Sequence, residues 1–562
     1  MTPSPDCQAP LAPHAEARLQ RNLAALAQRD PELAARLCLP VRGDHVELGD
    51  DGGATYRVGE ARLALELPLQ RAGALVAGAR GAPELLLFGL GLGELAREAL
   101  DRPSVARAWA WERDPWLLRQ ALARTDYSAA LAGGRLRLAL GGDLRRLTRD
   151  ARRATVVEHP FLARVYDAER RLLGDGPWHR LALLATGGLF VDALGAALEG
   201  LGFGVYRADL AGLAVGELEH TVRRLEPELL ATVNYVDGLA EFCHRLDLDA
   251  LCWEIDPATT AVAAPDVPTR RVHVFTYRRS HVEAYRRAGF EHVEYLPLAA
   301  DPEERRPPAL GPAERARYGA PLSFVGSSLV QQVDTYRGLF LRCWSAWSGE
   351  SEERGARLLG EVLAAQREDG SRYLLPELLA ERAPGFLESA PPVPGGHAPL
   401  ALAAEIAACQ KRLGYLAGLG PLGLRLWGDP GWKLAERHGA RYAGPAGHRL
   451  ELSRIYAASR VNLDVGRLYQ NDIVPMRVFD ALACGGFVLA EHTPDLEELF
   501  EIGVEVAAYR DEADLRARAA WYLEHPEEAR AIARRGRAAV LERHAIRARV
   551  AHMLAALRRA PL

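Results

Sequence analysis

Residues Arg454–Tyr509, RIYAASRVNLDVGRLYQNDIVPMRVFDALACGGFVLAEHTPDLEELFEIGVEVAAY, decide the fold of the C-terminal half. Val461–Val465 is rich in β-branched residues and predicts a short strand. Pro475 stands where a helix should begin, because its fixed φ suits the first helical position. The glycine pair Gly485 and Gly486 should end that helix, and FVLA then predicts a second strand. The order strand, helix, strand is typical of a parallel α/β sheet.

Charged residues gather at the front of this predicted helix. Asp472 precedes it, Asp480 lies inside it, and Arg467 and Arg477 flank the same turn. A helix N-terminus favours a phosphate, and carboxylates accept hydrogen bonds from sugar hydroxyls. The pattern is what a sugar nucleotide would need. An ordinary α/β unit with solvated acids remains the alternative.

The segment FDALACGGFVLAEHTPDLEELFEIGVEVAAY resembles the C-terminal signature of the CgeB-type (spore-maturation-like) glycosyltransferases, which have GT-B architecture. The resemblance covers roughly residues 180 to 555. Many retaining GT-B enzymes carry two glutamates separated by seven residues, where this chain has Asp472 and Asp480. The resemblance implies that Asp480 accepts from the nucleotide ribose and that Asp472 faces the donor sugar. Asp472 and Arg477 are therefore the expected catalytic residues, although each aspartate is one methylene shorter than the family's glutamate.

Glycine turns supply the rest of the expected donor site. The strand ending at Gly326 and Ser327 resembles the place where such enzymes hold the donor diphosphate. Gly187 and Gly188 form a turn after another predicted strand, which the resemblance places near the acceptor and the donor phosphates. Their alternative role is only to permit a tight turn. Gly485, with Arg467, completes the set of expected nucleotide-sugar contacts.

A second glycine motif occurs earlier in the chain. Gly89, Gly91 and Gly93 follow the apolar run LLLF, and later predicted strands end at Glu112 and Asp143. This order resembles the Rossmann-like fold of class I methyltransferases, in which the glycine turn, the first acid and the second acid lie around S-adenosylmethionine. A fold that needs these glycines without binding a ligand is the alternative. NLAALAQRDPELAARL, together with LFGLGLGE, also resembles the N-terminal part of Maf-like flagellin-glycosylation proteins.

Two histidines and a tryptophan lie close to these predicted strand ends. His281 and His273 could act as bases or ligands, but a histidine near a helix start is more often a surface or capping residue. Trp432 could stack on a base, although an interior tryptophan is the commoner case. The motif WEIDP, with Pro257 at its end, also matches the family pattern.

Composition excludes several other classes of protein. Acidic residues number 74 against 70 basic ones, so the basic residues do not indicate a nucleic-acid partner. The seven cysteines form no C-x-x-C pair, which predicts neither a zinc site nor a disulfide framework. The N-terminus lacks a signal-peptide pattern, and no long apolar run predicts a membrane span. A cytoplasmic location is the expectation.

The sequence thus predicts an α/β protein in which two Rossmann-like halves of a GT-B fold follow a further Rossmann-like domain. The expected boundaries are 1–60 (helical or mixed), 61–178 (methyltransferase-like), 179–301 (acceptor side), 302–320 (linker), 321–540 (donor side, with a helical insert at 345–420) and 541–562 (a helix crossing back).

The expected activity is metal-independent transfer of a sugar from a UDP-, GDP- or dTDP-sugar to a protein or glycan. Flagellin, a surface polysaccharide or a coat component are conceivable acceptors. Two alternatives stay open at this point. One is an S-adenosylmethionine-dependent methyltransferase acting through residues 61–178, and the other is a degenerate protein that only binds a glycan or partner.

Overall fold

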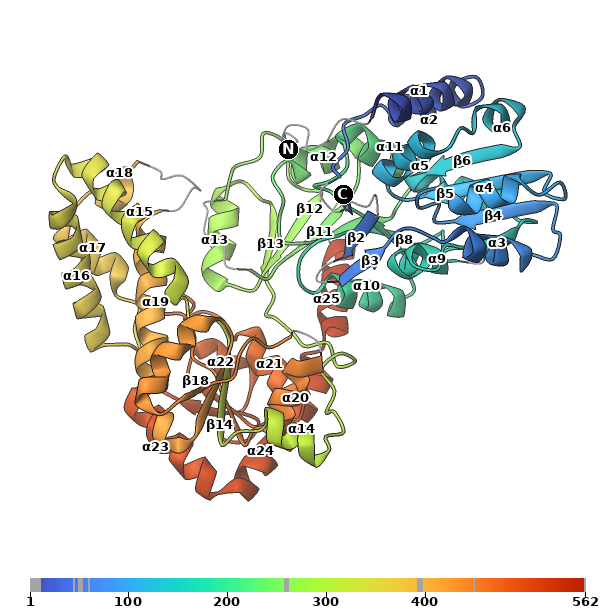
Figure 1. The fold of residues 1–562 in the computed structure, drawn as a ribbon. Helices are drawn as coiled ribbons and strands as arrows, with labels where there is room; N and C mark the ends of the chain where they lie inside the picture. Colours follow the sequence, from blue (N-terminus) through green and yellow to red (C-terminus); the bar gives the residue numbers. More distant parts are fainter. Residues whose placement is uncertain are drawn as a thin grey trace. The chain divides into compact units, whose positions relative to one another are not determined.

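The computed structural model describes residues 12–43, 46–48, 54–58, 61–174, 176–256, 262–391, 398–447 and 450–559. Pro257 of the WEIDP motif lies outside these ranges, as do parts of the segment 1–60. Chain contacts divide the protein into two compact units, residues 1–252 with 265–273, and residues 253–264 with 274–562. Figure 1 labels the helices and strands.

The first unit begins with helices and a small antiparallel sheet. These elements are α1 (Pro13–Ala27), α2 (Pro31–Arg36), β1 (Val46–Leu48), β2 (Ala54–Val58), β3 (Ala61–Ala64) and α3 (Leu69–Ala77). The described strands pair in the order β1-β2-β3. Leucines at helical spacing on α1, such as Leu19, Leu23 and Leu26, are buried, as their periodicity predicts.

A parallel sheet follows, with helices between its strands. Its elements are β4 (Glu84–Phe88), α4 (Glu94–Leu100), β5 (Arg107–Glu112), α5 (Pro115–Arg124), α6 (Ser128–Gly133), β6 (Leu136–Leu140), η1 (Gly141–Asp143), α7 (Leu144–Asp150), β7 (Thr155–Glu158), α8 (Leu162–Val165) and α9 (Asp167–Arg171). Among the described strands the order is β6-β5-β4-β7, so the chain changes direction across the sheet between β4 and β7. The apolar run LLLF forms β4 and is buried in the core.

The next sheet has the described order β13-β12-β11-β10-β8-β9. Its elements are β8 (Leu181–Ala185), α10 (Val191–Gly200), β9 (Gly204–Ala208), α11 (Val215–Leu225), β10 (Leu229–Val233), α12 (Leu239–Leu246), β11 (Ala250–Glu254), β12 (Val272–Thr276), α13 (Arg279–Arg287) and β13 (His292–Tyr295). The boundary between the two compact units falls inside β11 and β12.

The third α/β sheet belongs to the second unit and has the described order β16-β15-β14-β17-β18-β19. Its strands are β14 (Leu322–Val325), β15 (Leu424–Trp427), β16 (Arg441–Tyr442), β17 (Val461–Leu463), β18 (Val488–Glu491) and β19 (Ala507–Tyr509). The neighbouring strands of this sheet pair in parallel, for example with Phe324 opposite Leu426. In chain order this is the doubly wound arrangement 3-2-1-4-5-6, which has its topological switch point between β14 and β17.

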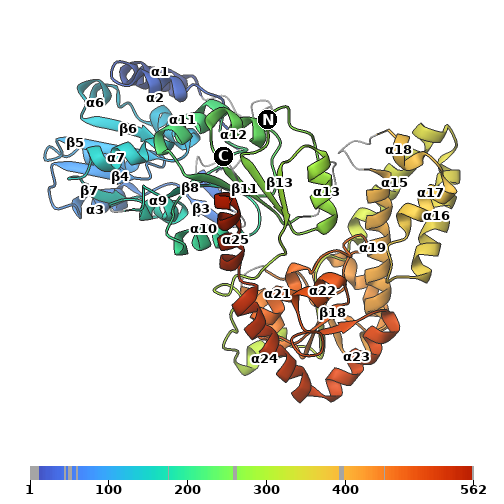
Figure 2. The same ribbon diagram turned by 180° about the vertical axis from the view of Figure 1, so that it is seen from behind.

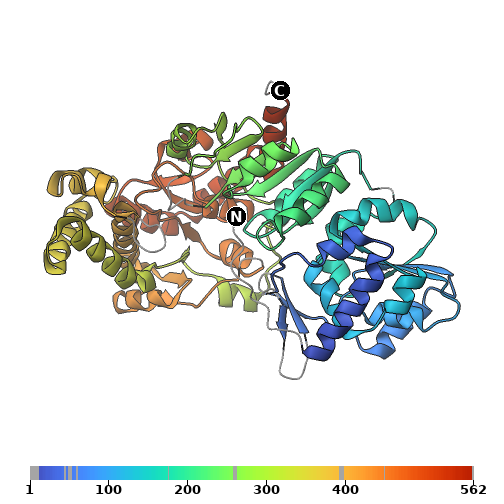
Figure 3. The same ribbon diagram turned by 90° about the horizontal axis from the view of Figure 1, so that it is seen from above.

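Helices cover this sheet and form an insert beside it. They are α14 (Pro312–Tyr318), α15 (Val330–Ser348), α16 (Glu352–Glu368), α17 (Leu375–Arg382), α18 (Phe386–Ser389), α19 (Pro399–Ala417), η2 (Gly420–Leu422), η3 (Pro430–His438), α20 (Leu450–Ala458), α21 (Met476–Ala483), α22 (Pro494–Leu499), α23 (Glu512–Glu524), α24 (Pro526–Arg543) and α25 (Ile546–Arg559). Helices α16, α17 and α18 stand apart from the sheet, drawn in yellow in Figure 3, and share their own apolar core with α15 and α19.

The predicted strand–helix–strand unit is confirmed as β17, α21 and β18, with Pro475 capping the helix. The last helix, α25, turns away from α24 (Figure 2). It contacts the chain just after β13, because Nε of Arg549 donates to the carbonyl of Pro297 at 2.9 Å. The fold class is therefore α/β, with three parallel Rossmann-like sheets among the described residues.

Candidate functional site

The switch point of the third sheet brings two loops together. One loop follows β14 and contains Gly326 and Ser327, and the other follows β17 and contains Arg467. The carboxyl ends of parallel strands meet at one edge, and the strands on either side of a switch point send their connections to opposite faces of the sheet. Open α/β sheets bind ligands in the crevice formed there.

Arg412, on α19, bridges these two loops. Its Nη1 donates to the carbonyl of Ser327 at 2.9 Å, and its Nε donates to the carbonyl of Val465 at 3.2 Å. The residue is only 6% exposed. Within the described part of the chain it forms no ion pair with a carboxylate. Arg412 therefore carries a buried positive charge whose hydrogen bonds go to carbonyl groups, and its guanidinium also lies 5.7 Å from the centre of the Phe324 ring.

Two further arginines lie beside Arg412, and each of them has a carboxylate partner. Nε of Arg477 donates to the carbonyl of Val325 at 2.7 Å, and its Nη1 is paired with the buried Asp464. Nη1 of Arg467 lies 3.0 Å from Oε1 of Glu405. Both predicted arginines are thus at the switch point.

The positive charges of Arg477 and Arg467 affect the pKa of Arg412. Burial, and then the nearby charges of Arg477 and Arg467, lower the pKa of Arg412 to about 9. Isolated buried charges are costly unless a counter-charge reaches them. An anion entering this edge of the sheet would supply that counter-charge.

The glycine turn after β14 is shaped around these side chains. A Cβ atom at Gly326 would lie 2.9 Å from Nη2 of Arg477, so the absent side chain leaves room for the guanidinium. The Ser327 hydroxyl donates to Oδ2 of Asp429 at 3.0 Å, and the Ser328 N–H donates to the same oxygen at 2.5 Å. The turn is held by Asp429, so its serine hydroxyl is already engaged.

Asp480 is buried away from this arginine group. It is 3% exposed, and its Oδ2 lies 3.0 Å from Nε of Arg305. Burial raises the pKa of Asp480 to about 6 in spite of that partner. Gly485 follows the same helix and has a φ of +77°, which is the conformation expected of a glycine that ends a helix.

Asp472, in the loop between β17 and α21, contacts the start of α13. Its Oδ1 is 3.2 Å from Nε of Arg278, and its Oδ2 accepts from the N–H and the hydroxyl of Ser280 at 3.0 and 2.6 Å. Both carboxylate oxygens are therefore engaged. Trp432 is fully buried, and its indole N–H donates to the Gly326 carbonyl at 2.7 Å, so the interior interpretation of this residue is confirmed.

Gly187 and Gly188 lie in the first unit, in the turn after β8. Their φ angles of +90° and +104° are in the region that favours glycine. A Cβ atom at Gly187 would meet nothing within 4 Å. The turn is therefore open on that side, and the role of these glycines in ligand binding stays a prediction.

The glycine turn after β4 is filled by side chains of its own domain. Gly89, Gly91 and Gly93 all have positive φ. A Cβ atom at Gly91 would lie 2.8 Å from Nε2 of His159, and one at Gly93 would lie 2.6 Å from the Tyr127 hydroxyl. His159 and Tyr127 thus lie where the backbone of a binding turn would approach its ligand.

Glu112 completes this closure. It is fully buried, and its Oε2 accepts from the N–H groups of Leu90 and Gly91 at 2.9 and 3.1 Å. Its Oε1 accepts from the N–H of Arg113 at 2.9 Å and from the N–H of Asp114 at 3.2 Å. Burial raises the pKa of Glu112 to about 7. The acid expected to hold a ribose therefore holds the glycine turn itself.

Asp143 belongs to a network of charges on another side of the first unit. Arg36 Nη1 lies 2.7 Å from its Oδ2, and His220 Nε2 lies 3.2 Å from its Oδ1. Burial alone would raise the pKa of Asp143, but His220 and Arg36 outweigh it and hold the pKa well below its usual range.

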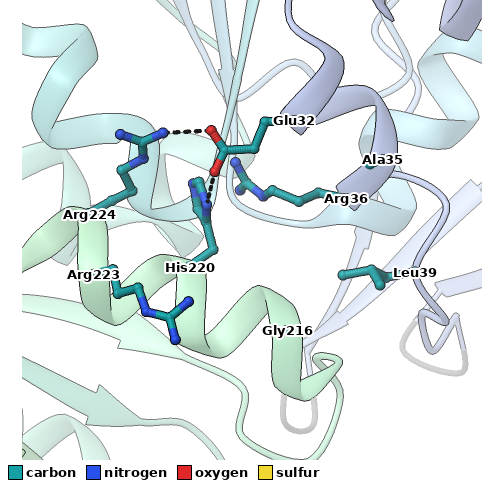
Figure 4. Close-up of a pocket in the computed structure, with 8 residues that line it drawn as sticks. All are labelled: Glu32, Ala35, Arg36, Leu39, Gly216, His220, Arg223 and Arg224. Atoms are coloured by element: carbon teal, nitrogen blue, oxygen red, sulfur yellow. Dashed lines mark hydrogen bonds and ion pairs between the residues drawn. The ribbon is translucent and has the colours of Figure 1, made fainter. Parts of the chain in front are cut away.

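A pocket of about 560 Å³ opens above this network. Figure 4 shows its lining, in which Glu32 pairs with both His220 and Arg224. The other lining residues are Ala35, Arg36, Leu39, Gly216 and Arg223. The charges in and below this pocket are paired with one another, and Asp143 has both of its oxygens engaged in that network.

Two residues that the structure places at or beside the candidate site were not predicted from the sequence. Arg412 falls in a segment expected to be only a helical insert, and Arg305 falls in a segment expected to be a linker. A usable signal was present for the first, because Lys411 and Arg412 interrupt the apolar face of a long helix and are both buried there. Such residues usually have a partner or a function.

Two other kinds of feature are absent from the described residues. No group of three or more His, Cys, Asp or Glu side chains in these ranges is arranged to hold a metal ion. None of the helices in the described part of the chain has the length and apolar character needed to cross a membrane.

Comparisons with known proteins give one family match. Residues 407–555 match the family model described as "Glycosyl transferase-like". The match includes Arg412, Arg467 and Arg477 and most of the third sheet. No curated protein sequence matches the chain.

Several solved structures are similar to parts of this chain. A glycosyltransferase from Rickettsia africae is 8% identical over 67% of this chain and 98% of its own, with a TM-score of 0.41. The Anabaena protein HepE, solved with UDP-glucose, is 13% identical over 70% and 95%, with a TM-score of 0.37. The Maf glycosyltransferase from Magnetospirillum magneticum is 13% identical over 50% and 56%, with a TM-score of 0.20.

Proposed function

We propose that the chain is a glycosyltransferase whose nucleotide-sugar donor places its diphosphate at the switch point of the third sheet. The observation that carries this proposal is Arg412, a buried cation that hydrogen-bonds to carbonyl groups and has no carboxylate ion pair in the described chain. The match of residues 407–555 to a glycosyl transferase-like family supports it.

A diphosphate suits this place for electrostatic reasons. Guanidinium groups form paired, charge-assisted hydrogen bonds with phosphate oxygens. Arg477 and Arg467 already have carboxylate partners, so the positive charge of Arg412 is the one in excess. Binding an anion there would relieve the cost of burying that charge.

The same arginines would serve the chemistry. In transfer, the bond between the anomeric carbon and the diphosphate oxygen breaks as the acceptor oxygen attaches to that carbon. Negative charge then develops on the departing nucleoside diphosphate, and fixed cations stabilise it. We therefore propose transfer that needs no divalent metal, with Arg412 and Arg477 as the main stabilising groups.

The two predicted carboxylates take other roles in this proposal. Asp480 braces α21 against Arg305, because the pair is buried, and Asp472 fastens the start of α13 to the loop after β17. The CgeB-type resemblance makes a protein or glycan the proposed acceptor, with UDP-, GDP- and dTDP-sugars as candidate donors.

Methyl transfer by the first unit is not favoured. S-adenosylmethionine would need the turn of Gly89, Gly91 and Gly93, which His159, Tyr127 and Glu112 already fill. That domain is proposed to be a structural part of the enzyme.

Calorimetric titration tests the donor site. UDP, GDP and dTDP are titrated into the wild-type protein and into the Arg412→Met variant, in which an apolar chain of similar length replaces the cation. Arg518→Ala is the matched control, because Arg518 is a half-exposed arginine paired with Asp514 on α23. We expect one nucleotide to bind the wild type and the control equally. Loss of a charge-assisted contact worth about 1.5–3 kcal/mol should weaken its binding to Arg412→Met by about 10- to 100-fold.

Two results would overturn the proposal. One is the absence of binding by all three nucleotides, and the other is equal binding by wild type and Arg412→Met. Thermal unfolding of each variant without ligand shows that a lost titration does not reflect a lost fold.

A further inference from the structure

A second pocket of the first unit is lined by positive side chains. Its volume is about 690 Å³, within the range of about 300–1,000 Å³ that is typical of small-molecule sites. The lining comes from α7, from the turn that follows it and from the segment that leads to β8. It includes Arg145, Arg149, Arg152, Gly176, Trp178 and His179.

Helical spacing gathers the arginines of this pocket. Arg145 and Arg149 are four residues apart on α7 and therefore share one face of that helix. Nη1 of Arg145 donates to the carbonyl of Leu225 at 2.7 Å and to Oε2 of Glu226 at 2.6 Å. These contacts fasten α7 to the end of α11. Like charges at this spacing destabilise a helix, so an anion bound between them would stabilise the arrangement.

Two of the arginines have no counter-charge. Arg149 and Arg152 are exposed, and neither forms an ion pair within the part of the chain that the structure describes. No described residue of this lining is acidic. The pocket beside Glu32 differs, because that carboxylate pairs with its positive neighbours. Of the two pockets, this one carries the excess positive charge and would attract an anion.

A tight turn adds an aromatic ring to the lining. A Cβ atom at Gly176 would lie 2.6 Å from the Leu172 Cα, so only glycine fits there. The N–H of Trp178 donates to the Gly176 carbonyl at 2.7 Å, which fixes the backbone that carries the indole. Trp178 is partly buried, and His179 beside it is exposed. An indole offers a flat apolar face to the C–H groups of a sugar ring, and an imidazole N–H can donate to an oxygen.

We propose that this pocket binds a sugar phosphate, with the phosphate on Arg149 and Arg152 and the sugar ring against Trp178. Guanidinium groups form charge-assisted hydrogen bonds with phosphate oxygens. A neutral sugar would leave the arginines without a counter-charge, and a bare anion would make no use of the indole. The pocket lies within the first unit, and the inference does not depend on the proposed donor site in the third sheet.

Calorimetric titration of the full-length protein tests this site. The probes are glucose 6-phosphate, fructose 1,6-bisphosphate, inorganic phosphate and glucose. We expect the bisphosphate to bind most tightly, because it can meet both arginines, and inorganic phosphate to bind more weakly than either sugar phosphate. Glucose should give no heat. Higher ionic strength should weaken the binding of every phosphate, because salt screens exposed charges.

Variants separate the charges from the ring. Arg149→Gln and Arg152→Gln should each weaken binding of the sugar phosphates by about tenfold, the lower end of the range for a hydrogen bond to a charged group. Trp178→Leu should weaken the sugar phosphates severalfold and leave the affinity for inorganic phosphate unchanged. Arg223→Gln is the matched control, because Arg223 is an exposed arginine that lines the other pocket and is paired with Glu219 at 3.3 Å.

Each of the following outcomes overturns the inference. One is that neither sugar phosphate binds the wild type, and another is that both arginine variants keep the wild-type affinity. A third is that inorganic phosphate binds as tightly as the sugar phosphates and that Trp178→Leu changes nothing, which would describe a general anion site. Thermal unfolding without ligand shows whether each variant is folded.

The same titrations keep this site distinct from the proposed donor site. Arg412→Met should bind the sugar phosphates as the wild type does, and Arg149→Gln should keep the wild-type affinity for the nucleoside diphosphate. Loss of sugar-phosphate binding in Arg412→Met alone would place these ligands at the third sheet and overturn the inference. Absence of nucleotide binding would overturn the proposed function and leave this pocket standing.

Discussion

Nε of Arg305 lies 3.0 Å from Oδ2 of Asp480, and their side chains are only 9% and 5% exposed. Asp480→Ala should therefore destabilise the protein, because it leaves the Arg305 guanidinium buried beside an empty space. Breaking a buried pair on one side costs about 3–5 kcal/mol, and urea unfolding measures it. The double variant Arg305→Met with Asp480→Leu should recover most of that loss. If folded Asp480→Ala binds its nucleotide more than tenfold weaker than the wild type, Asp480 contacts the ribose and the bracing role is wrong.

Glu112 should matter for the stability of the first unit and not for cofactor binding. In Glu112→Gln the side-chain NH₂ replaces an oxygen that accepted hydrogen bonds from backbone N–H groups. Those N–H groups then lose their acceptor, and each buried unsatisfied donor costs about 1–3 kcal/mol. We expect thermal unfolding at a clearly lower temperature. Glu158→Gln, at the end of β7 in the same sheet and half-exposed, should change little. S-adenosylmethionine should not raise the unfolding temperature of the wild type, and a clear rise would reopen the methyltransferase alternative.

Gly326 offers a substitution directed at the site. In Gly326→Ala the new methyl group would meet the Arg477 guanidinium at 2.9 Å and push it aside, and it would also lie 3.1 Å from the Phe324 ring. Nucleotide binding should weaken severalfold while the fold persists, because the end of a long side chain can move. The control is Gly360→Ala on the exposed face of α16, where a Cβ atom meets nothing within 4 Å. That change should stabilise the protein by about 0.5–1 kcal/mol and leave nucleotide affinity unchanged in calorimetry.

His544 makes stability depend on pH. Its Nε2 donates to the Leu499 carbonyl and its Nδ1 accepts from Nη2 of Arg549, both at 2.9 Å. Burial, and then the charge of Arg549, lower the pKa of His544 to about 4. An unfolded chain, with a histidine pKa of about 6.5, binds more protons between these values, so the folded state loses stability as pH falls from 6.5 to 4. The loss from this group is on the order of 3 kcal/mol.

The variant His544→Gln isolates that contribution. Glutamine can donate to Leu499 and accept from Arg549 without titrating. The difference in unfolding free energy between pH 7 and pH 4.5 should therefore be smaller in His544→Gln than in the wild type. His525→Ala, which changes a partly exposed histidine stacked on Trp521, should leave the wild-type difference intact. An equal pH dependence in His544→Gln would exclude His544 as its source.

Divalent metal should be dispensable if arginines stabilise the leaving diphosphate. Turnover of the active donor should persist after exhaustive treatment with EDTA, because Arg412 and Arg477 belong to the chain. Turnover that disappears with EDTA and returns with Mg²⁺ or Mn²⁺ would contradict metal-independent transfer.

The sequence predicted the frame of this site better than its electrostatics. Pro475, the glycine pair and the β-branched run located β17, α21 and β18, because these signals are local. The partners of Asp480 and Arg412 could not be predicted, since they depend on which distant segments pack together. Arg305 lies 175 positions before Asp480 in the sequence, and no local sequence pattern predicts that the two residues pair.

The glycine turn after β4 is a second case in which the sequence predicted the backbone and not the contacts of the side chains. Gly89, Gly91 and Gly93 were read correctly as a turn that requires positive φ, and Glu112 was expected at the end of the next strand. The spacing could not tell whether Glu112 points to a ligand or back to the turn. That choice depends on His159 and on the other side chains that fill the crevice.

The contact of α25 with the segment after β13 has a consequence for synthesis. Arg549 donates to the carbonyls of Pro297 and Leu298, which lie about 250 residues earlier in the chain. These carbonyls leave the ribosome long before their partner exists. The second unit can therefore reach its final packing only after α25 has been translated, and until then its incomplete core exposes apolar surface that favours aggregation.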